Sequence, residues 1–447
     1  MRPNPRSARR VLMLCYYFPP ISSAGTHRSV AFARWLQHFG WHPVVLTVHR
    51  SRTRWELSRE EVPTDVEVVR SSEWDLQGVL ALLSGMFNRA CDLLRLRRRP
   101  SPFYAWCLPD PQIAWLSTLR GVVLARNAEC VYASCSPFSS ALSACVIKHV
   151  TGKPLVLDFR DPWALNPHAN HSRGKTRILG WLEAWAVRSC DALILNTQGA
   201  EQLYRRRHAA HAHKMSCLPN GFDCLNLPAA AVPGGRFSIM HVGEFYRSRT
   251  PARLLEALAS LDNDAIEFVQ VGPWCEAFAR YEGRVRIRHI DRVTHGEALS
   301  LMRTASVLYL AQGWEEGVSE YVSVASKTYE YLATGTPILA DVPPGDNADV
   351  IQRYAHRAWV VTSRSVEALA SVIAQAYESR GDLERRVTPA FERTFNRRHQ
   401  AAILASVLDK VTSPCERDVP RERWNGVAPG QPSSVESHIQ VDGCNGY

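Results

Sequence analysis

The stretch Phe237-Ser-Ile-Met-His-Val-Gly243 is the starting point for the fold, because a short apolar run ends there in a glycine. Thr250-Pro251 then indicates a helix start, with threonine as the expected N-cap and proline at the first helical position. A helix is expected over Ala252–Leu261, and a further apolar run, Ile266–Gly272, follows it directly. This alternation of apolar runs and helical patterns is typical of βαβ units with parallel strands.

The N-terminal part of the chain opens in the same way. The apolar run Arg10–Phe18 predicts a buried strand, which Pro19-Pro20 ends. An amphipathic stretch, Ser29–Phe39, precedes a second apolar run, Pro43–Val48. The repetition predicts an α/β protein with two doubly wound domains, each built on its own parallel sheet.

The domain boundary is expected where hydrophobic periodicity is lost. The segment 225–235 contains Pro228 and Pro233-Gly-Gly235 and shows no such pattern. We therefore predict an N-terminal domain over 1–228 and a second domain over 236–394. A last helix is expected over 395–411, and the segment 412–447, rich in Gly, Pro, Ser and charge, is expected to be a disordered tail.

Composition narrows the class of protein. The chain has 447 residues, 46% of them hydrophobic and 21% charged, which suits a globular protein with several buried cores. Its net charge of +10 favours an anionic partner, although charge alone does not choose among nucleotide, phospholipid and nucleic acid. No apolar run approaches the roughly 20 residues needed to span a bilayer, and the basic N-terminus lacks a cleavage site for export. Its 12 cysteines form no Cys-x-x-Cys pair, so a reducing cytoplasm is expected.

Ligands of open α/β sheets gather beyond the carboxyl ends of the strands, and the first such loop contains Gly25. A glycine there permits a tight turn, and the helix start that follows offers N–H groups to a phosphate. The signal is weak by itself, because a plain strand-to-helix turn looks the same. Neither the Gly-x-Gly-x-x-Gly nor the P-loop pattern is present, so common dinucleotide and nucleotide-hydrolase sites are not indicated.

A second loop, Asp158-Phe-Arg-Asp-Pro-Trp163, ends a buried strand in charged side chains. One interpretation is structural: Asp158 pairs with Arg160 while Asp161 caps a turn. We favour the other interpretation, in which these residues face a hydroxyl-rich or phosphorylated ligand, because charges at such an edge are costly unless they face a cleft or one another.

Two further loops carry the strongest signals for an anion. Gly243 ends a strand, and Arg249 precedes a helix start, where a guanidinium is favourable beside a bound anion or in solvent. Lys327 and Glu330 are three positions apart near the start of a short helix that we expect to begin at an N-cap, Ser326. They form either a surface ion pair or a site in which the lysine binds phosphate and the glutamate accepts hydrogen bonds from vicinal hydroxyls.

Other features have less informative interpretations. Asp262-Asn-Asp264 has the Asp-x-Asp appearance of a metal site but is interpreted as a turn after a helix. Trp181 and Trp185 are expected in the core. The segment 79–99 combines an apolar helical face with an arginine-rich end. It could be a core helix with a solvated end or could lie on an anionic membrane surface, and both interpretations stay open.

These loops, taken in order, resemble a known family. Tyr17-Phe-Pro-Pro20, Asp158–Trp163, Pro219–Asp223, His241-Val-Gly243 and Lys327–Ile338 are similar to motifs of the retaining GT-B glycosyltransferases of family 4. The resemblance is closest to bacterial members that build surface or secreted glycans, and it spans most of the chain between residues 11 and 404. It implies two Rossmann-like domains facing a cleft, with the helix over 395–411 packing back on the first domain.

The resemblance also implies roles for individual residues. The donor would be a nucleotide-diphosphate sugar, and the acceptor a hydroxyl group of a glycan or lipid-linked glycan. Its diphosphate would contact Gly243, Arg249 and Lys327, and its ribose would contact Glu330. Gly25 would approach the donor from the other domain, and the acceptor side would contain Asp158, Arg160 and Asp161.

One position departs from the family pattern. Many relatives have two glutamates eight positions apart, but the residue eight positions before Glu330 is Val322. That acid normally helps to hold the donor sugar. Glu315, Glu316 and Glu320 are close enough in sequence to replace it.

The resemblance thus implies a cytoplasmic hexosyltransferase that acts in polysaccharide biosynthesis. A position at the inner face of a membrane follows only from the second of the two interpretations of the segment 79–99. Arg249 and Lys327 would stabilise the departing diphosphate, so that no metal or other cofactor is expected. A sugar-nucleotide epimerase of the same architecture and a non-catalytic partner in glycan assembly are the alternatives. No nucleic-acid recognition motif is present.

Overall fold

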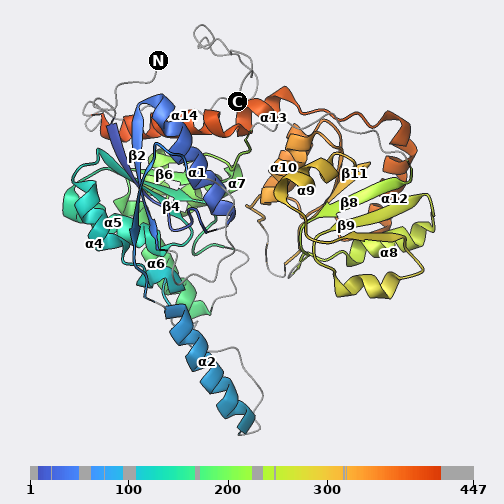
Figure 1. Cartoon of the computed structure of the whole chain (residues 1–447), viewed down its shortest axis with the longest axis horizontal. Coiled ribbons are helices and arrows are strands. Elements are labelled where there is room, and N and C mark those ends of the chain that lie inside the picture. Colours follow the sequence, from blue (N-terminus) through green and yellow to red (C-terminus); the bar gives the residue numbers. More distant parts are fainter. Residues whose placement is uncertain are drawn as a thin grey trace. The chain divides into compact units, whose positions relative to one another are not determined.

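The computed structural model describes residues 9–21, 23–49, 62–74, 76–93, 107–166, 172–223, 235–245, 248–315, 318 and 320–413 (Figure 1). Two all-parallel sheets organise this part of the chain, one of seven strands and one of six. This confirms the predicted fold class of two doubly wound α/β domains.

The seven-stranded sheet has the order β3-β2-β1-β4-β5-β6-β7. Its direction of growth reverses between β1 and β4, which are paired with Val11 opposite Cys130. Loops that follow these strands are therefore at the switch point, where ligands of such sheets bind. The strands are β1 (Arg9–Leu14), β2 (Trp41–Val48), β3 (Glu67–Ser71), β4 (Cys130–Cys135), β5 (Leu155–Phe159), β6 (Ala192–Leu195) and β7 (Met215–Cys217).

Each face of this sheet is covered by helices, so successive strand residues enter two different cores. Leu12 and Leu14 belong to one core, to which helices over 117–125, 139–151, 173–189 and 198–207 also contribute. Val11 and Met13 belong to the other, which contains residues of helices over 24–35 and 397–412. This double burial explains why the strands are apolar without alternation. The helices are α1 (Ala24–Trp35), η1 (Leu36–Phe39), α2 (Leu76–Leu93), η3 (Pro111–Ala114), α4 (Ser117–Ala125), α5 (Ser139–Thr151), α6 (Arg173–Ser189), α7 (Gln198–Arg207) and η4 (Ala209–Lys214).

The six-stranded sheet has the order β10-β9-β8-β11-β12-β13, with its switch point between β8 and β11. Its strands are β8 (Phe237–Val242), β9 (Ile266–Val271), β10 (Ile287–Ile290), β11 (Val307–Ala311), β12 (Ile338–Asp341) and β13 (Ala358–Val361). Its helices are α8 (Ala252–Leu261), η5 (Glu276–Tyr281), α9 (His295–Met302), α10 (Ser326–Thr334), α11 (Asp346–Tyr354), α12 (Val366–Glu378) and η6 (Ser379–Asp382).

The chain ends, within the described residues, in α13 (Pro389–Phe395) and α14 (Arg397–Thr412). Leu404 and Leu408 of α14 are buried in the core of the first sheet beside α1. Trp41 Nε1 donates to the Asp409 carboxylate at 2.9 Å, which fastens the end of α14 to β2. The predicted boundary over 225–235 and the predicted tail over 412–447 fall almost wholly outside the described residues. Every helix in the described ranges is too short or too polar to cross a membrane.

Candidate functional site

A contact between Lys327 and His241 forms the centre of the site, where β8 ends and α10 begins. Lys327 Nζ lies 3.3 Å from His241 Nε2, and His241 Nδ1 lies 3.2 Å from the carbonyl oxygen of Tyr309. A carbonyl can only accept, so Nδ1 carries the proton and Nε2 is left to accept from the ammonium. The buried imidazole therefore fixes where the lysine points.

The charges around this contact repel one another. Burial, together with the nearby Lys327 and Arg249, holds the pKa of His241 well below its ordinary value, so the ring is neutral. Burial and Arg249 also lower the pKa of Lys327 to about 8, against the opposing effect of Glu330. Positive charge is thus concentrated where burial and neighbouring cations disfavour it. A bound anion would reverse that cost.

Gly243 brings the backbone next to this positive charge. Its φ of +113° lies in the left-handed region, and an added Cβ would lie 2.9 Å from Lys327 Nζ. Its N–H donates to the carbonyl of Val271 at 2.8 Å, which continues the sheet pairing to this residue. A larger residue would be strained and would also displace the ammonium, so both requirements select glycine.

Two helices begin near these residues, and the N-cap of each differs from the predicted N-cap by one residue. The N-cap of α10 is Ala325, which makes no side-chain hydrogen bond, and Ser326 is already helical. The N-cap of α8 is Pro251, while Thr250 Oγ1 accepts from the N–H of Ala252 at 3.0 Å. The start of α10 consequently has no side-chain cap and can offer its N–H groups to an anion.

Glu330 is connected to the first domain through two histidines. Glu330 Oε1 lies 3.9 Å from Nδ1 of His295 at the start of α9. The ring of His295 stacks on that of His27, with 6.5 Å between the ring centroids. His27 lies in α1, two residues after Gly25. The contacts therefore lead from the Gly25 region to Glu330, the residue predicted to bind ribose hydroxyls.

Gly25 and Arg160 lie against each other. Gly25 is a buried residue of the first turn of α1, and a Cβ added to it would lie 1.7 Å from Arg160 Nη1. The glycine is thus needed to admit the guanidinium, and not to make the tight turn suggested by the sequence. Arg160 also donates to the Ser136 carbonyl and lies over the ring of Tyr17 at 5.5 Å.

The structure does not place Asp158 where an acceptor could contact it, contrary to our prediction. Its side chain is fully buried and forms two hydrogen bonds with Arg28, of 2.8 and 3.0 Å, rather than pairing with Arg160. Tyr132 donates to the same carboxylate. Asp158 thus compensates a buried arginine, which explains why a charge is tolerated there. Asp161, in contrast, is exposed and stays a candidate for the acceptor side.

Val322, the departure from the family pattern, is buried in the hydrophobic core of the first sheet. Its carbonyl oxygen accepts from Thr197 Oγ1 at 3.0 Å. An acid at this position would be buried against apolar side chains. Of the nearby acids, Glu320 pairs with the exposed Arg206, Glu316 lies outside the described residues, and Glu315 accepts from Ser248 Oγ at 3.3 Å, next to Arg249.

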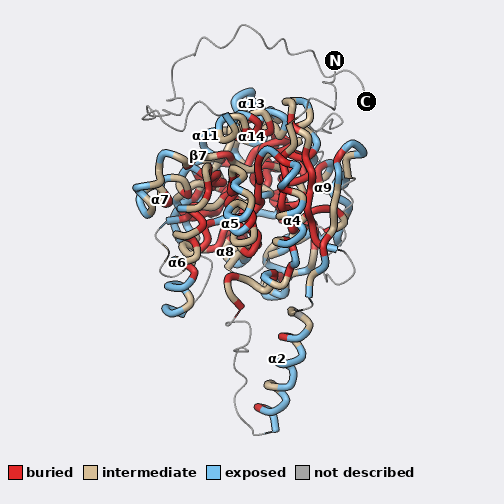
Figure 2. Tube along the Cα trace, turned by 90° about the vertical axis from the view of Figure 1, so that its left-hand side faces the viewer, coloured by how far each residue is buried: buried red, intermediate tan, exposed pale blue. Residues whose placement is uncertain are grey.

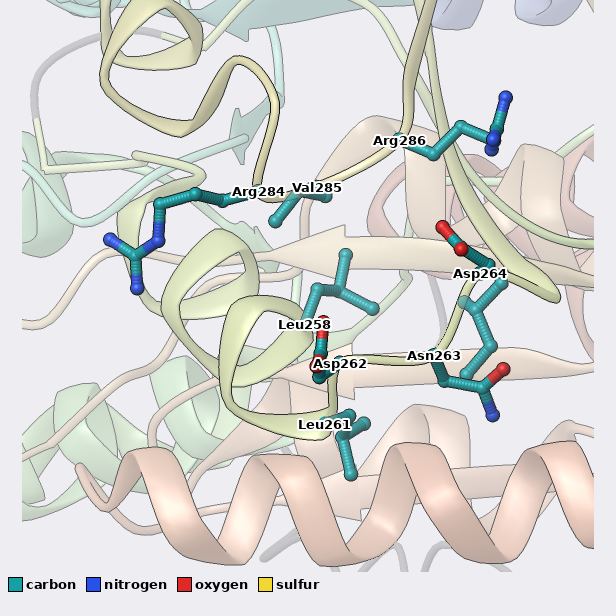
Figure 3. Close-up of a pocket in the computed structure, with 9 residues that line it drawn as sticks. Leu258, Leu261, Asp262, Asn263, Asp264, Arg284, Val285 and Arg286 are labelled. Atoms are coloured by element: carbon teal, nitrogen blue, oxygen red, sulfur yellow. The ribbon is translucent and has the colours of Figure 1, made fainter.

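A separate pocket lies at the opposite, amino-terminal edge of the second sheet (Figure 3). It includes Asp262 and Asp264, and Asp262 ends α8 with a φ of +43°. Figure 3 shows Arg284 and Arg286 pointing away from each other, so they do not converge on one ligand. This geometry agrees with a turn at Asp262–Asp264. In the part of the chain that the structure describes, no group of three His, Cys, Asp or Glu side chains could hold a metal ion.

Two family models match the chain, one for each sheet. A model described as a glycosyl transferase 4-like domain matches residues 25–221, and a glycosyl transferase-like model matches residues 247–409. No curated protein matches the sequence. The first match includes Gly25 and Arg160, and the second includes Arg249, Lys327 and Glu330.

Solved structures share the fold at low sequence identity. HepE of Anabaena, solved with UDP and glucose, is 14% identical with a TM-score of 0.54, covering 90% of this chain and 96% of its own. A glycosyltransferase of Rickettsia africae is 12% identical with a TM-score of 0.59, and the match covers 91% of this chain and 99% of that protein. The lipopolysaccharide outer core galactosyltransferase WaaB is 11% identical with a TM-score of 0.57, and the match covers 90% of this chain and 99% of that protein.

Proposed function

Because the chain belongs to the GT-B glycosyltransferases, we propose that it moves a hexose from a nucleotide-diphosphate donor to a hydroxyl acceptor with retention of configuration. One observation carries the donor assignment: Lys327, with a pKa lowered to about 8 by burial and Arg249, lies against the glycine that ends β8. A diphosphate is the ligand that such a concentration of positive charge suits.

The chemistry follows from the charges of the departing group. Cleavage of the anomeric bond places negative charge on the diphosphate, and Lys327, Arg249 and the start of α10 would stabilise it as it develops. His241 would keep the lysine oriented through the 3.3 Å contact. Glu330 would accept hydrogen bonds from the ribose hydroxyls. We propose that these two cations supply the charge that a metal supplies in other enzymes.

Arg160 and Asp161 would contribute to the acceptor side, with Gly25 allowing the guanidinium to approach α1. The acceptor we propose is a glycan or lipid-linked glycan in bacterial polysaccharide assembly, at the inner face of the membrane. The HepE structures with UDP and with UDP-glucose make UDP the first nucleotide to test.

Glu315 is our candidate to replace the acid missing at position 322. Its carboxylate accepts from Ser248, the neighbour of Arg249, at 3.3 Å. An added Cβ on Gly313 would lie 2.0 Å from Ser248 Oγ, so the segment that carries Glu315 is close to the segment that carries Arg249. A carboxylate there could hold a sugar hydroxyl beside the diphosphate.

The test is turnover by purified protein supplied with UDP-sugars, with and without acceptor glycans and with and without EDTA. The proposal predicts acceptor-dependent release of UDP that EDTA does not stop and an unchanged anomeric configuration in the product. Lys327→Ala should lower turnover by about two orders of magnitude or more. Epimerised sugar with donor alone would favour the epimerase alternative, and the absence of any turnover or donor hydrolysis would favour a non-catalytic partner.

A further inference from the structure

The helix α11 begins in close contact with the segment 320–322. Gly345, its N-cap, has a φ of +145°, and a Cβ added to it would clash with the backbone oxygen of Tyr321. The N–H of Asp346, the first residue of the helix, donates to the same oxygen at 3.1 Å. Glycine is needed for this approach of two backbones, which fixes the first turn of α11 against the segment.

The carboxylate of Asp346 contacts the first domain. Its two oxygens lie 3.0 and 3.2 Å from the backbone nitrogen of Gly199, which donates to them from the first turn of α7. A Cβ added to Gly199 would lie 2.5 Å from Oδ2 of Asp346, so a side chain there would displace the carboxylate. The N-cap of α7, Thr197, accepts from the N–H of Ala200. Asp346 thus satisfies a second N–H group of a helix start, where a carboxylate is also favoured by the helix dipole.

Two further contacts join the same parts of the chain. Thr197 Oγ1 donates to the carbonyl oxygen of Val322 at 3.0 Å, and the side chain of Val322 is buried in the core of the first sheet. Arg206 pairs with Glu320 at 2.8 Å, but their side chains are 57% and 49% exposed, so this pair contributes little. We call the junction the α7 clasp; it consists of Thr197, Gly199, Val322 and Asp346.

The helix α7 is otherwise held by its own domain along one side. Figure 2 shows it mostly in the colours of exposed and intermediate residues, and its buried residues are Ala200 and Tyr204. Tyr204 donates to the fully buried Glu183 of α6 at 2.6 Å. On α6, Trp185 packs partly against the core, whereas Trp181, expected in the core, is 67% exposed. Both helices are therefore surface elements, and the first turn of α7 is the part that the second domain contacts.

On the first domain, the α7 clasp adjoins the proposed acceptor side. Asn196 immediately precedes Thr197 and is buried. Its Nδ2 donates to the backbone oxygen of Arg160 at 2.9 Å. Because this bond joins the start of α7 to the loop after β5, a displacement of α7 would also displace Arg160.

On the second domain, the α7 clasp adjoins Lys327. Asn347 follows Asp346 and is buried together with Thr328 and Gln312. Thr328 Oγ1 donates to Asn347 Oδ1 at 2.7 Å, and Asn347 Nδ2 donates to Gln312 Oε1 at 2.8 Å. Thr328 follows Lys327 in the first turn of α10, so this buried network holds the starts of α10 and α11 together.

From these contacts we infer that Asp346 is a positioning residue for the sugar transfer proposed above, on which the inference rests. It holds the start of α10, with Lys327, in register with the acceptor side of the first domain. The contacts that orient Lys327 lie within the second domain and do not include Asp346. Loss of the carboxylate should therefore lower kcat and leave UDP affinity unchanged, because a displacement of about 1 Å between reacting groups can cost about a hundredfold in rate.

Steady-state kinetics with a UDP-sugar and an acceptor, together with calorimetry of UDP binding, test the inference. Asp346→Ala and Gly199→Ala should each lower kcat at least about tenfold and change the Kd of UDP by less than about twofold. In the double variant the added Cβ no longer meets a carboxylate, so kcat should equal that of Asp346→Ala alone. Asp349→Ala removes an exposed acid from the same turn of α11 and is the matched control, with kcat unchanged.

Hydrogen exchange at the start of α7 provides a measurement that needs no turnover. The N–H of Gly199 should exchange at least about tenfold faster in Asp346→Ala than in the unaltered chain, and at the unaltered rate in Asp349→Ala. If the unaltered chain transfers no sugar, the proposed function fails, whereas the α7 clasp is then supported by faster exchange and overturned by unchanged exchange.

Three kinetic results would overturn the inference. They are an unchanged kcat in folded Asp346→Ala, a loss of UDP affinity as large as the loss of kcat, and additive effects of the substitutions at positions 199 and 346. Thermal unfolding shows whether each variant is folded. If Asp346→Ala does not fold, Asp346→Asn, which keeps the shape and loses the charge, replaces it with the same expected direction.

Discussion

Replacing Lys327 with methionine should make the empty protein more stable at neutral pH. The pKa of the lysine is lowered from 10.5 to about 8. One pKa unit corresponds to about 1.4 kcal/mol. The charged ammonium therefore lowers the free energy of unfolding at pH 7 by about 3 kcal/mol. Methionine keeps the unbranched chain without the charge. The lost hydrogen bond to His241 offsets about 1 kcal/mol, leaving a gain of about 2 kcal/mol.

The effect of Lys327→Met on the free energy of unfolding depends on pH, and this dependence identifies the charge of the lysine as its cause. Between pH 8 and 10.5 the unfolded chain binds more protons at this lysine than the folded chain, so the unaltered protein gains stability as pH rises. Near pH 10 only about 1 kcal/mol of the penalty remains, so the advantage of Lys327→Met should disappear there.

Thermal unfolding without ligand at pH 7 and at pH 10 measures this effect. A gain of about 2 kcal/mol corresponds to an increase in Tm of about 4–8 °C for a domain of this size. Lys410→Met, the same change at an exposed position of α14, is the matched control and should shift stability by less than about 0.5 kcal/mol. A Lys327→Met variant that is less stable than the parent by the same amount at both pH values would refute the reasoning.

Further substitutions separate binding from stability. Gly243→Ala should weaken UDP binding at least about tenfold in calorimetry, whereas Gly283→Ala, also at positive φ but with open space around it, should cost stability alone. Asp158→Asn should lower the free energy of unfolding by about 3–5 kcal/mol in a denaturant titration, because Arg28 loses its buried partner, and a loss below 1 kcal/mol would argue against that pairing. Glu330→Gln should raise the KM for a UDP-sugar about tenfold but have little effect with the 2′-deoxyribose analogue; equal effects on both donors would exclude a ribose contact.

Much of the fold could be predicted because both sheets are buried on two faces. Strands such as β1 and β8 are then short apolar runs, which the sequence displays directly. β3 and β10 lie at sheet edges and contain exposed or half-buried charged residues, so they have no comparable signal. Their positions depend on pairing with an inner strand.

The site was predictable only where local spacing decides it. Lys327 and Glu330 are joined by one helical turn, and the glycine at the end of β8 follows from the strand pattern. The Arg28–Asp158 pair spans 130 positions, and the contact between Lys327 and His241 spans 86. Such partners are set by strand order, whereas the only partner that local spacing offered for Asp158 was Arg160.

Proton uptake on UDP binding tests the central claim most directly. Calorimetry at pH 8 in two buffers of different ionisation enthalpy reports the protons that the complex takes up. If Lys327, half protonated near its pKa of about 8, binds the diphosphate, about half a proton should be taken up per UDP, and none by Lys327→Met. Equal uptake by both proteins, or UDP binding that is unaffected by the substitution, would contradict the account.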